Sequence, residues 1–225
     1  VERFAFPELP ELRERSPAPD SPKVVWPECN DTETARACAE TADGILHQLS
    51  LERPTVAAFT SPGDGDGKTS LLIALAPQLA KRIAGGMLVV DANFCKPDLT
   101  ARLNMPPGET PARPALIYPT NLPRLNVLPA LRCRGGSTTA TPTHSCTATP
   151  IKPAGPWIEE LREGWSLVLL DTASLAHSEV TPLARCCDGV YLVVRLGHTT
   201  RRAVAEAARA IRGAGGRLLG SVVVG

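Results

Sequence analysis

The sequence lacks an excess of charge of either sign. Its 24 lysines and arginines nearly balance its 23 aspartates and glutamates, which gives a formal net charge of +1. Proteins that bind nucleic acid or anionic membranes through charge alone need a concentration of basic residues. The composition therefore predicts no nucleic acid as a partner.

Long apolar runs are missing as well, since none approaches the roughly 20 residues that a membrane-spanning helix needs. No charged and then apolar leader of the secretory type opens the chain. We therefore expect a cytoplasmic protein, with membrane association only through a partner or an upstream segment. Because the chain begins with Val1 and not with Met, we expect its natural N-terminus to be trimmed or to lie upstream in a longer protein.

Cysteine motifs are absent too. The seven cysteines are odd in number, and no two of them have the CxxC spacing. This pattern argues against a disulfide framework and against a structural zinc site. We expect reduced and mostly buried thiols.

Regular structure is not expected in the first 30 residues, because their six prolines cannot continue a helix or a central strand. We expect residues 1–30 to form an extended tail or linker. Residues 31–225 are predicted to form one domain. Within it, the Pro-, Thr- and Gly-rich segments 104–123 and 132–156 are expected to be irregular excursions, disordered or poorly packed.

Apolar runs alternate with segments of helical spacing in this domain. The expected strands are 54–60, 86–92, 124–130, 165–173, 188–197 and 216–225, and the expected helices are 31–50, 68–84 and 199–215. The strands are continuously apolar, which is typical of a parallel sheet covered on both faces. The pattern thus predicts an α/β fold, a mostly parallel sheet with helices on both faces, with ligands bound at the carboxyl ends of the strands.

A glycine-rich loop follows the first of these strands. Its sequence PGDGDGKT, residues 62–69, nearly matches the phosphate-binding pattern G-x-x-x-x-G-K-[ST], with Pro62 in place of the first glycine. Glycines let successive backbone N–H groups turn toward a phosphate, and the start of the next helix adds partial positive charge. We therefore expect nucleotide phosphates to bind at Gly63, Asp64, Gly65, Asp66, Gly67, Lys68, Thr69 and Ser70.

Four residues are expected to carry the chemistry of this site. Lys68 is predicted to reach the β- and γ-phosphates, and the Thr69 hydroxyl to coordinate Mg²⁺. Asp91 and Asp171 each follow an apolar run, where a buried carboxylate is costly unless it meets a cation or hydrogen-bond donors. Magnesium would satisfy both acids. The alternative is that each acid only caps the helix that follows it.

Three segments resemble the bacterial tyrosine kinases of polysaccharide export, which are relatives of the ParA/MinD-type ATPases. They are TSPGDGDGKTS (Walker A), LVVDANFCKPDL (Walker A′) and SLVLLDTAS (Walker B). The resemblance covers residues 31–103 and 157–225. ParA and MinD proteins carry a signature lysine five positions before the P-loop lysine, and Gly63 occupies that position here. This difference favours the kinase branch.

The resemblance implies a P-loop NTPase (SIMIBI-like) architecture and a Mg-ATP site for phosphoryl transfer to tyrosine. In that family Lys68 would stabilise the transferred phosphate, Thr69 and Asp171 would hold Mg²⁺, and catalysis would be mostly positioning and charge neutralisation. Asp91 would orient or deprotonate the acceptor hydroxyl and lie near the metal. The resemblance also implies a membrane polysaccharide co-polymerase or export partner, and a homo-oligomer.

The sequence departs from the family pattern at several positions. Asn93 and Cys95 replace the second acid and the basic residue of Walker A′. Gly225 stands where the family usually has an asparagine near the adenine. Only Tyr118 and Tyr191 are tyrosines, so the family's tyrosine cluster is missing. Two alternatives to the kinase therefore stay open: a ParA/MinD-type ATPase switch, and a degenerate scaffold that binds nucleotide without catalysis.

Overall fold

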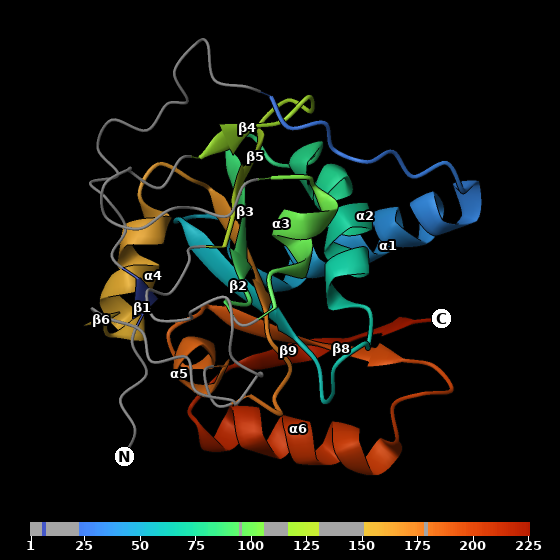
Figure 1. Ribbon diagram of the computed structural model, residues 1–225, viewed down its shortest axis with the longest axis vertical. Coiled ribbons are helices and arrows are strands. Elements are labelled where there is room, and N and C mark those ends of the chain that lie inside the picture. Colours follow the sequence, from blue (N-terminus) through green and yellow to red (C-terminus); the bar gives the residue numbers. More distant parts are fainter. Residues whose placement is uncertain (1–5, 8–22, 95, 106–116, 131–150, 178–179) are drawn as a thin grey trace, which may run out of the picture.

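A seven-stranded sheet forms the centre of the protein (Figure 1). The computed structural model describes residues 6–7, 23–94, 96–105, 117–130, 151–177 and 180–225. The strand order is β4-β5-β3-β7-β2-β8-β9, and every neighbouring pair except β4 and β5 is parallel. The bounds are β2 (Thr55–Thr60), β3 (Met87–Ala92), β4 (Tyr118–Pro119), β5 (Leu125–Leu128), β7 (Leu167–Thr172), β8 (Gly189–Arg195) and β9 (Leu218–Val224). A separate small sheet pairs β1 (Phe6–Pro7) with β6 (Ile151–Lys152).

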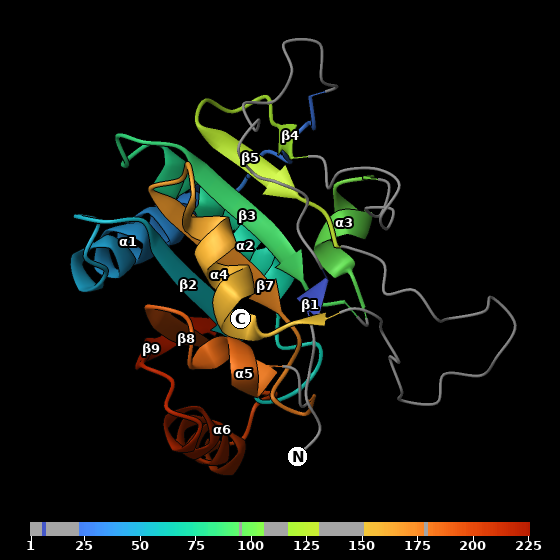
Figure 2. The ribbon, with the colours of Figure 1, turned by 90° about the vertical axis from the view of Figure 1, so that its left-hand side faces the viewer.

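Helices cover both faces of the large sheet. One apolar cluster joins it to α1 (Thr32–Gln48), α2 (Lys68–Ala80) and α3 (Asp98–Arg102). A second cluster, on the other face, joins it to α4 (Ala154–Arg162), α5 (Val180–Ala184) and α6 (Arg201–Gly213). Figure 2 shows α4 on one side of the sheet and α1 and α2 on the other. None of the described helices combines the length and the apolar character that crossing a bilayer requires.

The central strands send alternate side chains into the two clusters. On β2, Val56 and Ala58 belong to one cluster, while Ala57 and Phe59 belong to the other. All residues of β2, β3 and β7 are buried. This burial on both faces explains the continuously apolar runs in the sequence, and it confirms the predicted α/β fold.

The strands and helices expected from the sequence are all present, with somewhat shorter bounds. The first helix begins as predicted, because the Asp31 carboxylate accepts hydrogen bonds from the backbone N–H groups of Glu33 and Thr34. The helix after the glycine-rich loop ends at Ala80, four residues earlier than expected. Lys81 and Arg82 already belong to the turn that leads to β3.

The sequence did not predict the short elements α3, α4, α5, β1, β4 and β6. Three of them, β4, β6 and α4, overlap the segments expected to be irregular, and parts of those segments are packed: Ile117 and Thr120 are buried beside β4, and Ala154, the first residue of α4, is buried. The expectation of poor packing is therefore wrong for these parts. Gly155 and Pro156 hid the start of α4, although proline is tolerated in the first turn of a helix. Residues 106–116 and 131–150 lie outside the described part of the chain.

The end of the proline-rich stretch belongs to the folded domain. Val24 bridges to Thr120 beside β4, and its N–H donates to the Pro119 carbonyl. Trp26 is 1% exposed, and its indole N–H donates to the Ile73 carbonyl of α2 at 2.8 Å. The extended tail expected for residues 1–30 therefore does not reach this far, since a proline-rich backbone can still pack through single large side chains.

Candidate functional site

Two acids meet at the carboxyl edge of the sheet. Asp91 at the end of β3 and Asp171 at the end of β7 are direct neighbours in the parallel register. On the other side of β7, Asp171 lies opposite Phe59 of β2. The glycine-rich loop leaves β2 one residue later, so the order of these strands brings the loop and both acids together.

The glycine-rich loop is shaped by backbone conformations that favour glycine. Gly65 and Gly67 have φ values of 81° and 92°. A Cβ atom at Gly67 would come within 3.1 Å of a Val224 methyl group, so any larger residue would also meet β9. Gly67 directly precedes α2, and no described side chain caps the first turn of that helix. Its N–H groups are therefore available to an anion.

Lys68 is the first residue of α2 and is only 7% exposed. Its ammonium group donates a hydrogen bond to the Ser61 hydroxyl at 2.9 Å. Burial lowers the pKa of Lys68, while the charges of Asp171, Asp64 and Asp66 act in the opposite direction. Among the described residues this hydroxyl is the hydrogen-bond partner of the ammonium group, and a buried ammonium group with a neutral partner gains most from a nearby anion.

Asp171 is 1% exposed, and its two carboxylate oxygens differ in their hydrogen bonds. Its Oδ2 accepts a hydrogen bond from the Thr69 hydroxyl at 2.7 Å, whereas Oδ1 has no hydrogen-bond partner among the described residues. Burial raises the pKa of Asp171 to about 7, and the neighbouring charge of Asp91 adds to this effect. A buried carboxylate oxygen beside a threonine hydroxyl is a donor set that fits hydrated Mg²⁺.

Asp91 differs from Asp171 because both of its oxygens have partners. Oδ2 accepts hydrogen bonds from the Thr100 N–H at 2.8 Å and from the Thr100 hydroxyl at 2.7 Å, and Oδ1 accepts one from the Asn93 N–H at 3.2 Å. Burial nevertheless raises its pKa to about 6. Asp91 thus binds the first turn of α3, which is the capping alternative left open by the sequence. Its expected roles as base and metal ligand stay predictions.

The two aspartates of the loop fix the loop to neighbouring segments. Asp66 is 2% exposed, and its carboxylate accepts from the Gly63 N–H at 3.0 Å and from the Thr199 hydroxyl at 2.7 Å. Asp64 accepts from the Ser174 hydroxyl at 2.7 Å. In this arrangement the two carboxylates shape the loop, and the Gly63 N–H is already occupied by Asp66, so the N–H groups that follow it in the loop are the ones that can meet a ligand.

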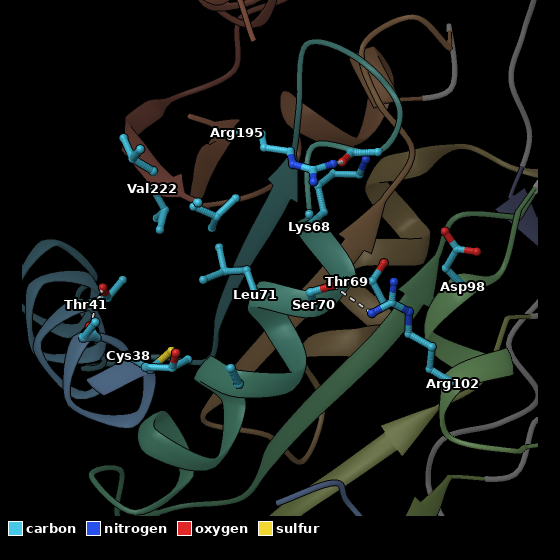
Figure 3. A pocket seen from close by; sticks show the side chains of 18 residues that line it. Cys38, Thr41, Lys68, Thr69, Ser70, Leu71, Asp98, Arg102, Arg195 and Val222 are labelled. Atoms are coloured by element: carbon cyan, nitrogen blue, oxygen red, sulfur yellow. Dashed lines mark hydrogen bonds between the residues drawn. The ribbon is translucent and has the colours of Figure 1, made fainter. Parts of the chain in front are cut away.

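A cavity of about 550 Å³ adjoins the loop and the start of α2 (Figure 3). Its volume is within the usual range for small-molecule sites. Charged and polar residues line one end, and mostly apolar residues of α1, α2 and β9 line the other. The residues at the charged end are Gly65, Gly67, Lys68, Thr69, Ser70, Asp98, Arg102 and Arg195, and those at the apolar end are Thr34, Ala37, Cys38, Thr41, Leu71, Ala74 and 222–225.

Three charged residues that line the cavity outside the loop, Asp98, Arg102 and Arg195, were not predicted from the sequence as site residues. Asp98 and Arg102 come from α3, four residues apart and therefore one above the other on a helix. That spacing could have identified them had α3 itself been predicted. Arg195 ends β8, and its guanidinium donates to the Gly65 carbonyl at 3.3 Å. No sequence pattern indicates that contact.

A strand, a glycine-rich loop and a helix at the centre of a mostly parallel sheet define the class of the protein as a P-loop NTPase fold. No family model matches the chain, and no curated protein matches it. Several solved structures, however, are similar to the chain in fold. The kinase domain of the Escherichia coli tyrosine kinase ETK has a TM-score of 0.72 at 15% identity, over 100% of this chain and 90% of that one.

Two further structures extend the comparison to nucleotide-dependent enzymes of the same fold. The Pyrococcus furiosus cell division ATPase MinD has a TM-score of 0.59 at 19% identity, over 76% of this chain and 71% of that one. Cobyrinic acid a,c-diamide synthase from Mycobacterium smegmatis, with bound ADP and magnesium, has a TM-score of 0.56 at 16% identity, over 75% and 73%. The protein thus has the fold of bacterial tyrosine kinase domains and MinD-type ATPases, as the three sequence motifs predicted.

Proposed function

We propose that this chain binds Mg-ATP at the glycine-rich loop and transfers its terminal phosphoryl group to a tyrosine hydroxyl. The observation that carries the proposal is the buried Oδ1 of Asp171, which has no hydrogen-bond partner in the described part of the chain and lies next to the Thr69 hydroxyl, at the same edge as Lys68. A buried polar atom without a partner is costly, so its retention favours a ligand that supplies one.

Different residues of the site bind different parts of Mg-ATP in this proposal. The backbone of residues 63–70 surrounds the phosphates, Lys68 exchanges its Ser61 partner for a phosphate oxygen, and Thr69 and Asp171 hold Mg²⁺. When bound, the metal neutralises charge on the phosphate oxygens. The M. smegmatis synthase, which shares the fold, has been crystallised with ADP and magnesium, and this supports the choice of nucleotide and metal.

The acceptor tyrosine is expected on another protein chain. Tyr191 is 2% exposed, stacks on Phe59, and donates its hydroxyl to the Gln48 side chain at 3.1 Å. Burial raises the pKa of Tyr191 to about 12. Tyr118, the other tyrosine, is half-buried in β4. We therefore include a partner in the proposal: a second copy of this chain in a homo-oligomer, or a polysaccharide co-polymerase or export protein at a membrane.

ATP hydrolysis without transfer to protein is a second candidate, and it would make the domain a switch of the ParA/MinD type. The lack of an exposed tyrosine favours it, and so does the likeness to MinD. Gly63, in place of the signature lysine, weighs against it. The Asn93 side chain weighs against both enzymes and for a scaffold, since it accepts from the Lys96 N–H and supplies no acid.

Incubation with γ-labelled ATP and Mg²⁺, alone and with a tyrosine-rich peptide, tests the proposal. The kinase predicts label on the peptide that depends on Lys68 and Asp171. Released phosphate without labelled protein would favour the ATPase switch. If nucleotide binds but neither label nor free phosphate appears, the chain is a scaffold and the catalytic proposal fails.

A further inference from the structure

The helix α3 presents a cation to the start of α2. The Arg102 guanidinium donates a hydrogen bond to the Ser70 hydroxyl at 2.8 Å. Ser70 lies in the first turn of α2, directly after Lys68 and Thr69. Figure 3 shows the Arg102 side chain extending across the cavity wall toward Ser70 and Thr69. A guanidinium therefore lies beside the helix end to which phosphates are expected to bind.

This helix is held in place by a buried contact. Thr100, at the middle of α3, gives both its N–H and its hydroxyl to Asp91, and its hydroxyl accepts from the Ala130 N–H at 2.8 Å. Leu99 is fully buried in the core. Asp91 is thereby linked to Arg102 through two residues of one helical turn, which a five-residue helix could not maintain by itself.

We propose that Arg102 binds a phosphate group of the nucleotide, and that Asp91 and Thr100 are positioning residues that hold Arg102 at the cavity. The inference rests on the proposed function and adds an unpredicted residue to its binding site. It also gives Asp91 a role in the site that requires no direct contact with the metal or with the acceptor.

The chemistry of the cavity supports a phosphate as the ligand of Arg102. A guanidinium has five N–H donors in a planar fork that matches phosphate oxygens, and Ser70 accepts from only one nitrogen. Arg102 is exposed, so a ligand can reach the remaining donors. Among the residues that line the cavity, Lys68, Arg102 and Arg195 are basic and Asp98 is acidic.

Calorimetric titration with Mg-ADP and with inorganic tripolyphosphate tests the role of Arg102. Arg102→Ala is expected to weaken both ligands by about tenfold, the effect of a charge-assisted hydrogen bond. Equal factors are expected because tripolyphosphate has no base or ribose. Arg202→Ala is the matched control: Arg202 is an exposed arginine on α6, paired with Glu206 outside the cavity. Unchanged affinities in Arg102→Ala would overturn the inference.

A double-mutant cycle tests the positioning residues. Thr100→Val removes the hydroxyl contact to Asp91 and is expected to weaken Mg-ADP in the wild-type background, but to add nothing when combined with Arg102→Ala. Thr100→Ser keeps the hydroxyl and is expected to restore affinity. Fully additive losses in the cycle would show that Thr100 does not act through Arg102.

The outcomes separate this inference from the proposed function. If Lys68→Ala abolishes binding while Arg102→Ala leaves it unchanged, only the inference is wrong. If wild-type protein binds neither Mg-ADP nor tripolyphosphate, the proposed function and the inference fail together.

Discussion

Burial of the Asp171 carboxylate has opposite consequences for stability and for metal binding. The ionised carboxylate lowers the stability of the fold because it is buried, yet a metal ion would bind it in the ionised form. Burial raises its pKa from 3.8 to about 7. The unfolded chain therefore releases this proton at lower pH than the folded protein does. Between these two pKa values, the free energy of unfolding falls as pH rises, and above the folded pKa the loss is complete. Without a ligand, the ionised Asp171 therefore lowers the free energy of unfolding.

Asp171→Asn is expected to remove this loss. At about pH 8 the variant should exceed the wild type in free energy of unfolding by roughly 2–4 kcal/mol, from about 1.4 kcal/mol per pKa unit. Near pH 4 the two proteins should be almost equally stable. Urea denaturation of the ligand-free proteins at several pH values measures the difference. If the free energies of unfolding of the two proteins change with pH in the same way, the buried Asp171 carboxylate does not destabilise the fold.

Gly67 provides a second test at the residue scale. Because of its positive φ and the nearby Val224 methyl group, Gly67→Ala is expected to lower the free energy of unfolding by about 1–3 kcal/mol and to weaken nucleotide binding. Gly213→Ala is the control, since Gly213 ends α6 with open space around it. Thermal unfolding and calorimetric nucleotide titration of both variants measure these effects. If Gly67→Ala and Gly213→Ala lower stability and affinity by similar amounts, the conformation of Gly67 is not a special requirement of the loop.

Among the elements, α4, β2 and β8 are joined by one ion-pair cluster at the edge of the sheet opposite the site. Asp188 precedes β8, accepts from the Val56 N–H, and pairs with Arg162 of α4 and with Arg53. The side chains of Asp188 and Arg162 are each 12% exposed. Removal of the Asp188 charge leaves the largely buried Arg162 side chain with only the exposed Glu159 as an ion-pair partner among the described residues, and the loss of a partner from a buried pair is strongly destabilising.

Asp188→Ala is therefore expected to lower the free energy of unfolding by about 3 kcal/mol. Glu206→Ala breaks the pair of Glu206 with Arg202 on the surface of α6, and a change of at most about 0.5 kcal/mol is expected there. Urea denaturation of both variants provides the comparison. If the two changes are equal, the Asp188 cluster is no more than a surface contact.

Elements differ in how well the sequence predicts them. The long apolar strands and α1, α2 and α6 were predicted because burial on two faces, or a cap such as Asp31, leaves a local pattern. The five-residue helices α3 and α5 leave none, and Pro156 concealed α4. The different roles of Asp91 and Asp171 depend on Thr100, nine residues from Asp91, whose position only the folded chain fixes.

Over the whole molecule, the segment before α1 closes the core on the side of α2. Val24 and Trp26 belong to the same apolar cluster as α1 and α2, while Val25 between them is 76% exposed. The Trp26 backbone N–H also donates to the Asn121 side chain at 2.7 Å. A segment that the proline content marks as a linker thus joins two distant parts of the chain.

Trp26→Ala is expected to lower the free energy of unfolding by about 3–5 kcal/mol, because it empties a fully buried position. Val25→Ala changes the neighbouring, exposed side chain and should have little effect. Equilibrium denaturation followed by far-UV circular dichroism measures both. Equal stabilities of the Trp26→Ala variant and the wild type would mean that this segment is not part of the domain.

The central claim is that Lys68, Thr69 and Asp171 together bind Mg-ATP, and calorimetric titration of wild type and Lys68→Ala tests it most directly. Wild-type protein should bind Mg-ATP with a heat that disappears when the metal is chelated. Lys68→Ala should bind at least about tenfold more weakly, because a buried charge-assisted contact is lost. Equal heats in the two proteins, or no heat in either, would contradict the account.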